Sequence, residues 1–410
     1  MNKLPEDWEI KKLKDIGNVY TGITPPTSDK ENFGNEHLFV TSADIKENKY
    51  IFNSIRKLSN KGFEKTKKFK KGDILYVCIG SIGKIALAKT DFSCNQQINV
   101  LRVNKEIDNE FIYYQLMNSF PYISKFISKR VVPIMNKTTF ENLEISLPSL
   151  DEQKRIAAAL SKIDAYLENT IKLIEEKERF KRGITKKLLT CKEGENIPEA
   201  RFKGFEGEWE IVKLGDIGTI TATGVDKKIN DNETPIKLLN YLDVFNRNKL
   251  YEKEISYMTT ATEKQLEKCN IRKGDLFITP SSEDKKGIAK SSVAMEDFKN
   301  TVYSYHIIRV RFNKEIDLKF KSYMCDTDFF HRQAYPLCDG SGQRYFIKLY
   351  NFRNMEICIP KSIKEQEKIG GYLSLLDKEI DNLKKQKELI NEMKRGAMQK
   401  LLSGKVRLLE

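Results

Sequence analysis

The chain has 410 residues, of which 40% are hydrophobic and 32% are charged. This length and composition exclude a small disulfide scaffold, a collagen-like chain and a disordered chain, so we expect two or more folded domains. Lysine and arginine number 72 against 58 acidic residues, and the formal charge of +14 favours nucleic acid or an acidic membrane surface as a partner.

The amino-terminal residues 1–8 lack the apolar core of a secretion signal. No run of about 18 apolar residues, the length that spans a bilayer, occurs further along the chain. We therefore expect a soluble, cytoplasmic protein with no membrane partner.

Residues 8–17 begin an internal repeat, and a repeat fixes the architecture of a chain before any local pattern does. Their sequence, WEIKKLKDIG, returns at residues 209–218 as WEIVKLGDIG, with eight of ten positions identical. Both tryptophans of the protein, Trp8 and Trp209, lie in these two segments. We therefore expect two homologous domains.

Further landmarks follow in the same order in both halves. They are a Lys-Gly-Asp turn that leads into an apolar strand (residues 71–73 and 273–275), an identical Asn-Lys-Glu-Ile-Asp segment (residues 104–108 and 313–317) and an exit from the domain through a proline (Pro148 and Pro360). The preserved order extends the repeat over the whole of each domain.

A long helix is predicted after each proline. Each starts with Glu-Gln, at residues 152–153 and 365–366, and continues with apolar residues at alternating steps of three and four. This spacing predicts a coiled-coil seam, which consists of Ile156, Leu160, Ile163, Leu167 and Ile174 in the first helix and of Ile369, Leu373, Leu376, Ile380 and Leu383 in the second. Roughly forty residues make each helix about 60 Å long.

A seam needs a partner to cover it, and each helix is the obvious partner of the other. The first helix connects the two domains and the second leaves the second domain, so an antiparallel pair with a domain at each end satisfies both connections. Two separate surface helices are the alternative.

The predicted fold class is therefore α+β. Two similar mixed α/β domains are separated by an antiparallel pair of long coiled-coil helices, with a pseudo-twofold internal repeat. The predicted boundaries are residues 1–150 for the first domain, 151–190 for the central helix, 191–208 for a linker, 209–361 for the second domain and 362–410 for the carboxyl-terminal helix. Residues 403–408 resemble part of the linker, which would bring the two termini together.

The halves diverge between the landmarks, and residues 24–70 scarcely align with residues 220–272. This divergence has two alternative explanations, neutral drift and adaptation to two different ligands. Both variable regions combine side chains that pair with base edges with Lys and Arg, which also hold phosphate. The predicted DNA-binding residues are Ser42, Asp44, Lys46, Ser81, Lys84, Asn95, Gln96, Gln97, Lys129, Arg130, Asn136 and Lys137 in the first half, and Asn240, Asp243, Ser281, Ser282, Lys285, Lys286, Tyr303, His306, Ser341, Gln343 and Arg344 in the second.

Motifs of catalysis match poorly. Residues 80–84, GSIGK, resemble the end of a phosphate-binding loop, but Cys78 and Ile85 occupy positions where that loop needs Gly and Ser or Thr. Asp275 with residues 283–285 fits the spacing of nuclease metal ligands only loosely. The sequence also has no glycine-rich methyl-donor loop and no Asn-Pro-Pro-aromatic element. We expect a protein that reads DNA without cutting or modifying it, and so no catalytic residues.

Cysteine and histidine usage indicates no metal site. The cysteines are Cys78, Cys94, Cys191, Cys269, Cys325, Cys338 and Cys358, an odd number with no CxxC pair. The histidines are His37, His306 and His331, none of them spaced from another ligand as in a zinc site. We expect reduced thiols and no bound metal.

Taken in this order and twice over, the landmarks resemble those of type I restriction-modification specificity subunits. The resemblance covers essentially the whole chain. It rests on Trp8 and Trp209, the Gly72-Asp73 and Gly274-Asp275 turns, the exits at Pro148 and Pro360 with their Glu-Gln pairs, and the Lys-Leu-Leu helix ends at residues 187–189 and 400–402.

The resemblance implies a non-catalytic subunit in which each domain grips one half of a split, asymmetric double-stranded DNA target. The helices would set the half-site separation of one DNA turn, ~34 Å. They would also dock two methyltransferase subunits that modify adenine with S-adenosylmethionine, and restriction subunits would join them and use ATP and Mg. No cofactor is implied for this chain itself. A self-sufficient modification or restriction enzyme and a protein-binding coiled-coil adaptor are the alternatives.

Overall fold

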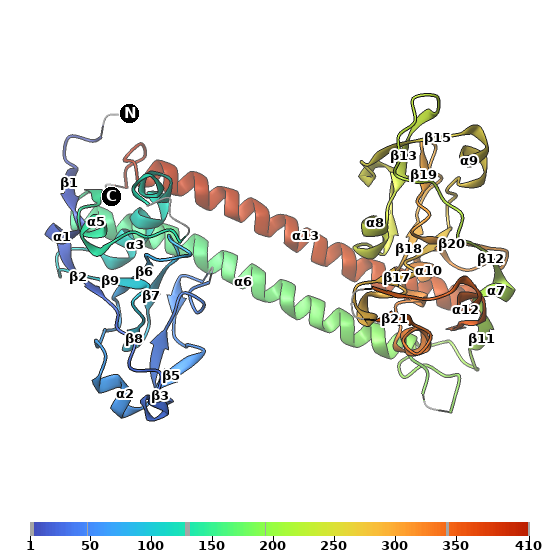
Figure 1. Ribbon diagram of the computed structural model, residues 1–410, viewed down its shortest axis with the longest axis horizontal. Helices are drawn as coiled ribbons and strands as arrows, with labels where there is room; N and C mark the ends of the chain where they lie inside the picture. The colour runs from blue at the N-terminus through green and yellow to red at the C-terminus, as the bar shows by residue number, and fades with distance from the viewer. Residues whose placement is uncertain (1–3, 47, 128–131, 193, 342–343, 409–410) are drawn as a thin grey trace. The chain divides into compact units, whose positions relative to one another are not determined.

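The computed structural model describes the chain except residues 1–3, 47, 128–131, 193, 342–343 and 409–410. It divides into two compact units (Figure 1). Unit 1 comprises residues 1–173 and 383–410, and unit 2 comprises residues 174–382. Each unit contains one mixed α/β domain together with segments of two long helices, α6 (Leu150–Leu189) and α13 (Ile363–Leu401). Among the described helices, none has the length and apolar character needed to cross a bilayer.

Unit 1 is built on a five-stranded and a three-stranded sheet. The five-stranded sheet has the order β2 (Gly17–Thr21), β9 (Ile98–Val103), β6 (Ile74–Val77), β7 (Ile85–Ala88), β4 (Tyr50–Ile51). The three-stranded sheet has the order β5 (Arg56–Leu58), β3 (Phe33–Val40), β8 (Phe92–Cys94). A separate pair is formed by β1 (Glu9–Lys12) and β10 (Glu144–Leu147). The helices are α1 (Leu13–Ile16), α2 (Asn60–Glu64), α3 (Asn109–Asn118), α4 (Phe120–Ile123) and α5 (Lys137–Glu141), with 3-10 turns η1 (Lys30–Asn32) and η2 (Ser124–Phe126).

Unit 2 repeats the two main sheets and the short strand pair of unit 1. Its five-stranded sheet has the order β12 (Gly218–Thr221), β20 (Ile308–Phe312), β16 (Leu276–Ile278), β18 (Ser291–Ala294), β14 (Lys249–Leu250). Its three-stranded sheet has the order β15 (Met258–Ala261), β13 (Thr234–Leu239), β19 (Thr301–Tyr303). The separate pair is formed by β11 (Glu210–Lys213) and β23 (Glu356–Ile359). A further sheet has the order β17 (Ser281–Ser282), β22 (Arg344–Phe346), β21 (Asp339–Ser341).

Most helices of unit 2 have a counterpart in unit 1 at the same place in the chain order. The helices are α7 (Leu214–Ile217), α8 (Tyr241–Phe245), α9 (Glu263–Lys268), α10 (Leu318–Met324), α11 (Asp328–Ala334) and α12 (Leu349–Asn354), with 3-10 turns η3 (Glu252–Glu254) and η4 (Lys285–Gly287). The repeat predicted from the sequence is therefore confirmed as a repeat of topology.

The central strand of each five-stranded sheet is buried on both faces, which explains its continuous apolar sequence. In β6, Ile74 and Tyr76 pack into one hydrophobic cluster while Leu75 and Val77 pack into another. In β16, Leu276 and Ile278 likewise pack into one hydrophobic cluster while Phe277 packs into another. Side chains alternate between the faces of a strand, so one short strand joins the two cores of its unit.

The repeated Lys-Gly-Asp segments form the turns before these central strands. Gly72 and Gly274 adopt φ values of 90° and 85°, which favour glycine over any residue with a Cβ atom. The following aspartate accepts a hydrogen bond from the backbone N–H three residues earlier, at 2.9 Å in Asp73 and 2.8 Å in Asp275. The repeated motif is thus a structural turn.

The repeated Glu-Gln pairs fasten each long helix to its domain. Gln153 donates to the carbonyl of Pro148 at 2.9 Å and accepts from the N–H of Asp108 at 3.0 Å. Gln366 makes the equivalent bonds to Pro360 at 2.8 Å and from Asp317 at 2.9 Å. Each identical Asn-Lys-Glu-Ile-Asp segment thus ends on the residue whose backbone N–H binds this glutamine, and the aspartate side chain caps the next helix by accepting from the N–H of Phe111 or Phe320.

The adjoining glutamates are bound by arginines from outside the domains. Glu152 pairs with Arg407 at 2.7 Å, and Glu365 pairs with Arg201 at 2.8 Å. Arg407 also binds Asp7 at 2.6 Å, so residues near the two chain ends meet in unit 1. The predicted correspondence between the carboxyl-terminal residues and the linker thus has an equivalent arginine on each side.

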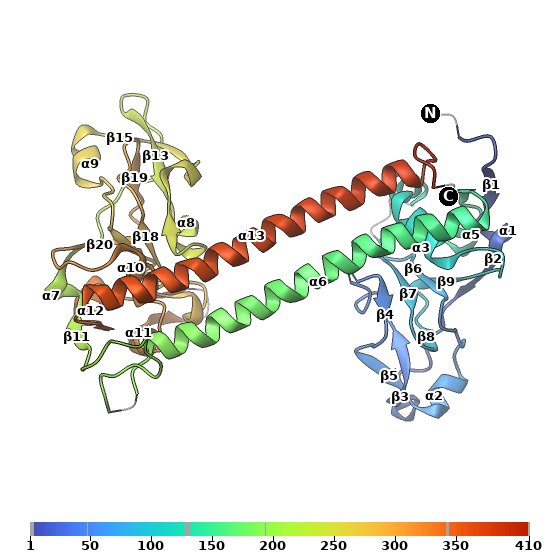
Figure 2. The same cartoon turned by 180° about the vertical axis from the view of Figure 1, so that it is seen from behind.

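Within each unit the segments of α6 and α13 run side by side and antiparallel (Figure 2). In unit 1, Asp164 pairs with Lys394 at 2.6 Å and Tyr166 contacts Gln386. In unit 2, Lys177 pairs with Glu379 at 2.7 Å and Lys181 with Asp377. Higher numbers on one helix therefore meet lower numbers on the other, as expected from the sequence.

The predicted seam residues face inward, but many do more than join the two helices. Ile156 and Leu160 belong to the unit 1 core, and Ile369, Leu373 and Leu376 belong to the unit 2 core. Ile174 and Ile380 are buried, while Ile163, Leu167 and Leu383 are half-buried. Near its domain, each helix therefore packs against the core of that domain as well as against the other helix.

Candidate nucleic-acid interface

Several predicted DNA-binding residues of unit 1 gather where two strands end. Strands β3 and β8 are parallel, with Val40 opposite Cys94, so their carboxyl ends lie at one edge of the sheet. Ser42 follows the first of these strands, and Asn95, Gln96 and Gln97 follow the second. The topology therefore brings together side chains that are more than fifty residues apart.

Hydrogen bonds connect these side chains into one group. Ser42 and Asn95 both donate to Oε1 of Gln97, at 3.1 and 3.0 Å. Lys84, from the turn between β6 and β7, donates to the carbonyl of Ser42 at 3.1 Å, and Thr24 donates to Gln96 at 2.5 Å. We call Ser42, Lys84, Asn95, Gln96 and Gln97 the first polar cluster. Its amides carry the donors and acceptors that read adenine edges, and its lysine suits phosphate.

Other candidates of unit 1 have structural partners. Asp44 accepts from the N–H of Thr41 at 2.8 Å and of Ile55 at 2.7 Å, and Asn136 caps α5 by accepting from Thr139 at 2.8 Å. Lys137 pairs with Glu141 at 3.1 Å. The exposed residues Lys46 and Ser81 stay candidates, whereas Lys129 and Arg130 lie outside the described residues.

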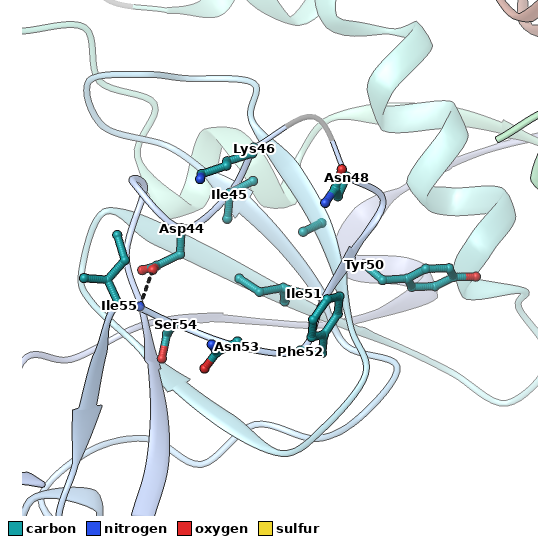
Figure 3. Close-up of a pocket in the computed structure, with 11 residues that line it drawn as sticks. Asp44, Ile45, Lys46, Asn48, Tyr50, Ile51, Phe52, Asn53, Ser54 and Ile55 are labelled. Carbon is teal, nitrogen blue, oxygen red and sulfur yellow. Dashed lines mark hydrogen bonds between the residues drawn. The ribbon is translucent and has the colours of Figure 1, made fainter. Parts of the chain in front are cut away.

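A hollow of about 230 Å³ lies beside Asp44 and Lys46 (Figure 3). Figure 3 shows the Asp44 carboxylate turned toward the backbone of Ile55, while Phe52, another residue of its lining, is strongly exposed. Asp44 therefore shapes this loop, and Lys46 is the cation it presents.

The candidate residues of unit 2 lie on different elements, because His306 follows β19 whereas Ser281 and Arg344 belong to the further sheet of β17 and β22. Arg344, from β22, donates to the hydroxyl of Ser281 at 3.2 Å, and the Lys285 ammonium lies 5.5 Å from the centre of the Tyr345 ring. The imidazole of His306 packs on Tyr305, with ring centres 3.9 Å apart. We call Ser281, Ser282, Lys285, His306 and Arg344 the second polar cluster.

The surroundings of the histidine in this cluster favour its neutral form. Burial lowers the pKa of His306 below 6.5, and the positive charges of Arg344 and Lys227 lower it further. A neutral imidazole both donates and accepts a hydrogen bond, which suits a base edge, while the neighbouring cations suit phosphate.

The structure corrects one prediction in unit 2 and reassigns others. Tyr303 is 0% exposed because it ends a core strand and packs on Phe277, so it presents no surface to DNA. Asp243 accepts from the N–H of Asn240 at 2.9 Å and pairs with Arg247 at 2.8 Å, which makes it and Asn240 parts of the start of α8. Gln343 and the side chains of Lys286 and Ser341 lie outside what the structure describes.

The carboxylate that superficially fits a nuclease site is a structural group. Asp275 is 1% exposed and is bound by Arg311 through two hydrogen bonds, of 2.8 and 2.6 Å. Asp73 and Arg102 form the same paired contact in unit 1, at 2.9 and 2.6 Å. In the part of the chain that the structure describes, no three His, Cys, Asp or Glu side chains come together as metal ligands.

Sequence reasoning missed a buried polar network that is also duplicated. In unit 1, Lys49 donates to Glu110 at 2.8 Å, Tyr114 at 3.0 Å and Ser161 at 2.6 Å, while Tyr114 donates to Asp164 at 2.5 Å. Asp164 also binds Lys394 of α13. We call Lys49, Glu110, Tyr114, Ser161, Asp164 and Lys394 the first anchor, because it ties the end of the five-stranded sheet to both long helices.

The second anchor has the same plan in unit 2. It consists of Lys249, Tyr323, Ser374, Asp377 and Lys181, in which Lys249 donates to Tyr323 and Ser374 at 2.9 Å each. Tyr323 and Lys181 both bind Asp377. The available sequence signal was Ser-x-x-Asp at matching places in the two helices, residues 161–164 and 374–377.

Burial and pairing shift the pKa of the anchor groups. Burial lowers the pKa of Lys49 and of Lys249, although the facing carboxylates oppose this. Burial alone would raise the pKa of Glu110 and of Asp377, but hydrogen bonds from their partners outweigh it and hold both below their usual values. Each anchor is therefore a set of charges that depend on one another.

Comparison with known proteins assigns the family. The sequence profile described as "Type I restriction modification DNA specificity domain" matches residues 5–176 and 206–392. The MjaVIII specificity subunit of a type I restriction enzyme from Methanocaldococcus jannaschii is 25% identical over 99% of this chain and 94% of its own length. The MjaX specificity subunit from the same organism, described as putative, is 26% identical over 100% of this chain and 96% of its own length.

Solved structures share the fold. A chain from a type I R-M system, in a study of complex assembly and conformational transition, aligns with a TM-score of 0.61 at 14% identity, covering 99% of this chain and 100% of that one. The S subunit from M. genitalium aligns with a TM-score of 0.57 at 18% identity, covering 98% and 97%. The profile covers both halves of the sequence, and the chain therefore belongs to the type I restriction-modification DNA specificity family.

Proposed function

We propose that this chain is the DNA-binding specificity subunit of a type I restriction-modification complex, in which each unit reads one half of a bipartite, asymmetric target. The observation that carries the proposal is one arrangement of two main sheets that occurs in both units, with a different polar cluster in each unit. A repeated frame supports the same task in both units, and different side chains support different half-sites.

We propose further that the chain itself is non-catalytic. Methylation with S-adenosylmethionine and cleavage with ATP and Mg belong to two methyltransferase subunits and to restriction subunits. The names of the relatives support this division, since they are called specificity subunits of restriction enzymes. The pairing of Asp275 with Arg311 also favours a non-catalytic chain, because both oxygens of that carboxylate already accept hydrogen bonds from the arginine.

The long helices are proposed to space the half-sites and to dock the methyltransferase subunits. Large apolar side chains are exposed on α6 and α13, among them Phe180, Leu375 and Leu389. Apolar side chains on a helix surface favour a protein partner when they cluster there.

The test is to assemble the chain with methyltransferase subunits and to map the methylated sites across a genome by sequencing. The double variant Gln96→Ala/Gln97→Ala should relax one half-site only, by about 1 to 3 kcal/mol of discrimination per base contact. The variant Ser282→Ala/Arg344→Ala should relax the other half-site. Lys105→Ala, an exposed change in a turn of unit 1, is the matched control and should leave the target unchanged.

Two outcomes would overturn this assignment. If either double variant altered both half-sites together, the units would not read DNA independently. If neither variant altered the target, the polar clusters would not be the reading surfaces.

The alternative functions have their own tests. Methyl transfer by the purified chain alone would favour a self-sufficient enzyme. A steep loss of DNA binding as salt rises would count against the protein-binding adaptor, because contacts to phosphate release counterions and are strongly dependent on salt.

A further inference from the structure

Two cysteines that are far apart in the sequence meet in unit 2. The Sγ atoms of Cys191 and Cys358 are 3.0 Å apart, although the residues are separated by 167 positions. Cys191 follows the end of α6, and Cys358 lies on β23, the strand that leads to α13. Both side chains are half-buried rather than enclosed in a core.

Both sulfur atoms are held in place by ordered backbone. The backbone of Cys191 forms an isolated antiparallel β-bridge with Pro198. The linker also folds back on the end of α6, because the N–H of Glu199 donates to the carbonyl of Thr190 at 3.0 Å. Cys358 is paired with Ile211 in the antiparallel strand β11. A disulfide needs the sulfur atoms at about 2.05 Å, so a small side-chain movement closes the remaining gap.

We propose that Cys191 and Cys358 form a reversible redox pair, which a hydroperoxide oxidises to an intramolecular disulfide and a dithiol reduces again. This bond would join the residue that follows α6 to the strand that precedes α13. It would therefore close a covalent loop around the whole second α/β domain. The inference concerns modification of the chain and does not depend on the proposed DNA target.

The chemistry runs in two balanced steps. The Cys191 thiolate attacks hydrogen peroxide, so that an S–O bond forms, the O–O bond breaks and the leaving hydroxide takes up a proton to become water. The Cys358 sulfur then attacks the sulfenic sulfur of Cys191, so that the S–S bond forms, the S–O bond breaks and a second water leaves. Two thiols and one peroxide thus give one disulfide and two waters.

The surroundings of Cys191 suit the first step. Cys191 lines a cavity of about 490 Å³ together with Lys186, His331 and Arg332, which gives a small oxidant access to its sulfur. The Cys358 thiol donates a hydrogen bond that lowers the pKa of Cys191, although burial opposes the shift. Thiolate character and access are the two features that make a cysteine reactive toward peroxide.

The other five cysteines have the opposite character. Burial raises the pKa of Cys78 to about 12, and it also raises the pKa of Cys94, Cys269, Cys325 and Cys338. A raised pKa leaves a thiol with little thiolate, and four of these five side chains are also buried, so oxidation should be selective for the meeting pair.

Unit 1 provides an internal comparison. The position on β10 equivalent to Cys358 is Ser146, which lies opposite Ile10 as Cys358 lies opposite Ile211. Unit 1 therefore cannot form this bond, and its stability should not respond to oxidation.

The experiment treats the full chain with a small excess of hydrogen peroxide and counts free thiols after denaturation. The count should fall from seven to five, peptide mapping should join Cys191 to Cys358, and dithiothreitol should restore seven. The urea midpoint reported by Trp209 should rise on oxidation, while the midpoint reported by Trp8 should not.

Matched variants decide the assignment. Cys191→Ser and Cys358→Ser should each abolish the joined peptide and the rise in the Trp209 midpoint. Cys338→Ser, which removes another half-buried thiol of unit 2, should still form the bond. An unchanged count of seven, a disulfide to another cysteine, or loss of the bond in Cys338→Ser would overturn the proposal. Alanine variants at the same positions guard against a folding defect specific to serine.

Discussion

The two polar clusters differ in chemistry although the sheets beneath them share one strand order. The first cluster is made mainly of amides and a hydroxyl, with one lysine from a turn. The second contains an arginine, a lysine and a histidine packed among tyrosine rings, and part of it comes from the sheet of β17, β22 and β21. The two units therefore share their main sheets but differ in the side chains of their polar clusters and in the additional sheet of unit 2.

The anchors differ far less than the clusters. Both place a lysine between a tyrosine, a serine and a carboxylate, and both end on a lysine from the other long helix. Unit 1 adds Glu110, where the corresponding residue of unit 2 is Lys319. Buried polar groups must all be satisfied together, so the interior is constrained while the exposed edge is free to vary.

The largest expected effect is the loss of an anchor carboxylate. Asp164→Ala leaves Lys394 and Tyr114 without their partner and should destabilise unit 1 by about 3 to 5 kcal/mol, because the side chain of Asp164 is only 8% exposed. Asp377→Ala should cost unit 2 about 2 kcal/mol, since its side chain is 24% exposed and solvent screens the charges.

The two tryptophans allow the units to be measured separately. Trp8 is buried in unit 1 and Trp209 in unit 2, so urea unfolding of Trp209→Phe and Trp8→Phe backgrounds reports one unit at a time. Glu388→Ala, an exposed change on α13, should leave the Trp8 transition unchanged. If Asp164→Ala in unit 1 and Asp377→Ala in unit 2 lowered the free energy of unfolding by equal amounts, the role assigned to burial would be contradicted.

A smaller difference should appear in acid. Folding lowers the pKa of Glu110 from 4.5 and of Asp377 from 3.8, so each contributes stability that is complete above its unfolded value and is lost as pH falls through its folded value. The stability of unit 1 should therefore begin to fall near pH 4.5 and that of the second anchor near pH 3.8.

Single variants separate these contributions from those of other acids. Glu110→Gln should flatten the acid dependence reported by Trp8 and leave that of Trp209 unchanged, and Asp377→Asn should do the reverse. Urea midpoints measured between pH 3 and pH 6 provide the test. A change in the wrong transition would argue against the two anchors acting within their own units.

The smallest expected effect compares two matched turn positions. Gly83 has a φ of 95° and Ala289 has a φ of 59°, and each precedes the strand that pairs with the central strand. Ala289→Gly should change the free energy of unfolding of unit 2 by less than about 1 kcal/mol, because relief of the positive φ is offset by the larger entropy loss of glycine and by removal of a buried methyl group.

The reverse change should be unfavourable in unit 1. A Cβ atom at Gly83 would lie 2.1 Å from the ring of Phe120, and the positive φ adds strain. Gly83→Ala should therefore destabilise unit 1 by about 1 to 2 kcal/mol. Stabilisation of unit 1 by this change, measured by the Trp8 transition, would contradict the interpretation.

The sequence predicted the repeated frame because its signals are local. Trp8 and Trp209, the Lys-Gly-Asp turns and the Glu-Gln helix starts depend on short segments, and the seam depends on a helical period that survives in a single sequence. These features are confirmed, and the structure adds what each repeated letter binds, as in the bond between Gln153 and Asp108.

The candidate DNA contacts were only partly predictable. The side chains of Gln96 and Arg344 are exposed, whereas Tyr303, also a predicted DNA-binding residue, lies in the core. In the run Tyr-Ser-Tyr-His, Tyr303 and Ser304 are buried, whereas Tyr305 is exposed and His306 is half-buried, because the core strand ends at Tyr303 and the chain then turns to the surface.

By itself, therefore, the sequence determined the duplication, the two long helices and the turns, since these follow from periodicity and from backbone preferences over a few residues. Only the tertiary structure decided the anchors, the polar clusters and the meeting of Cys191 with Cys358. Each of these joins residues that are far apart in the chain. Such contacts depend on which strands become neighbours, and that is settled by packing of the whole unit.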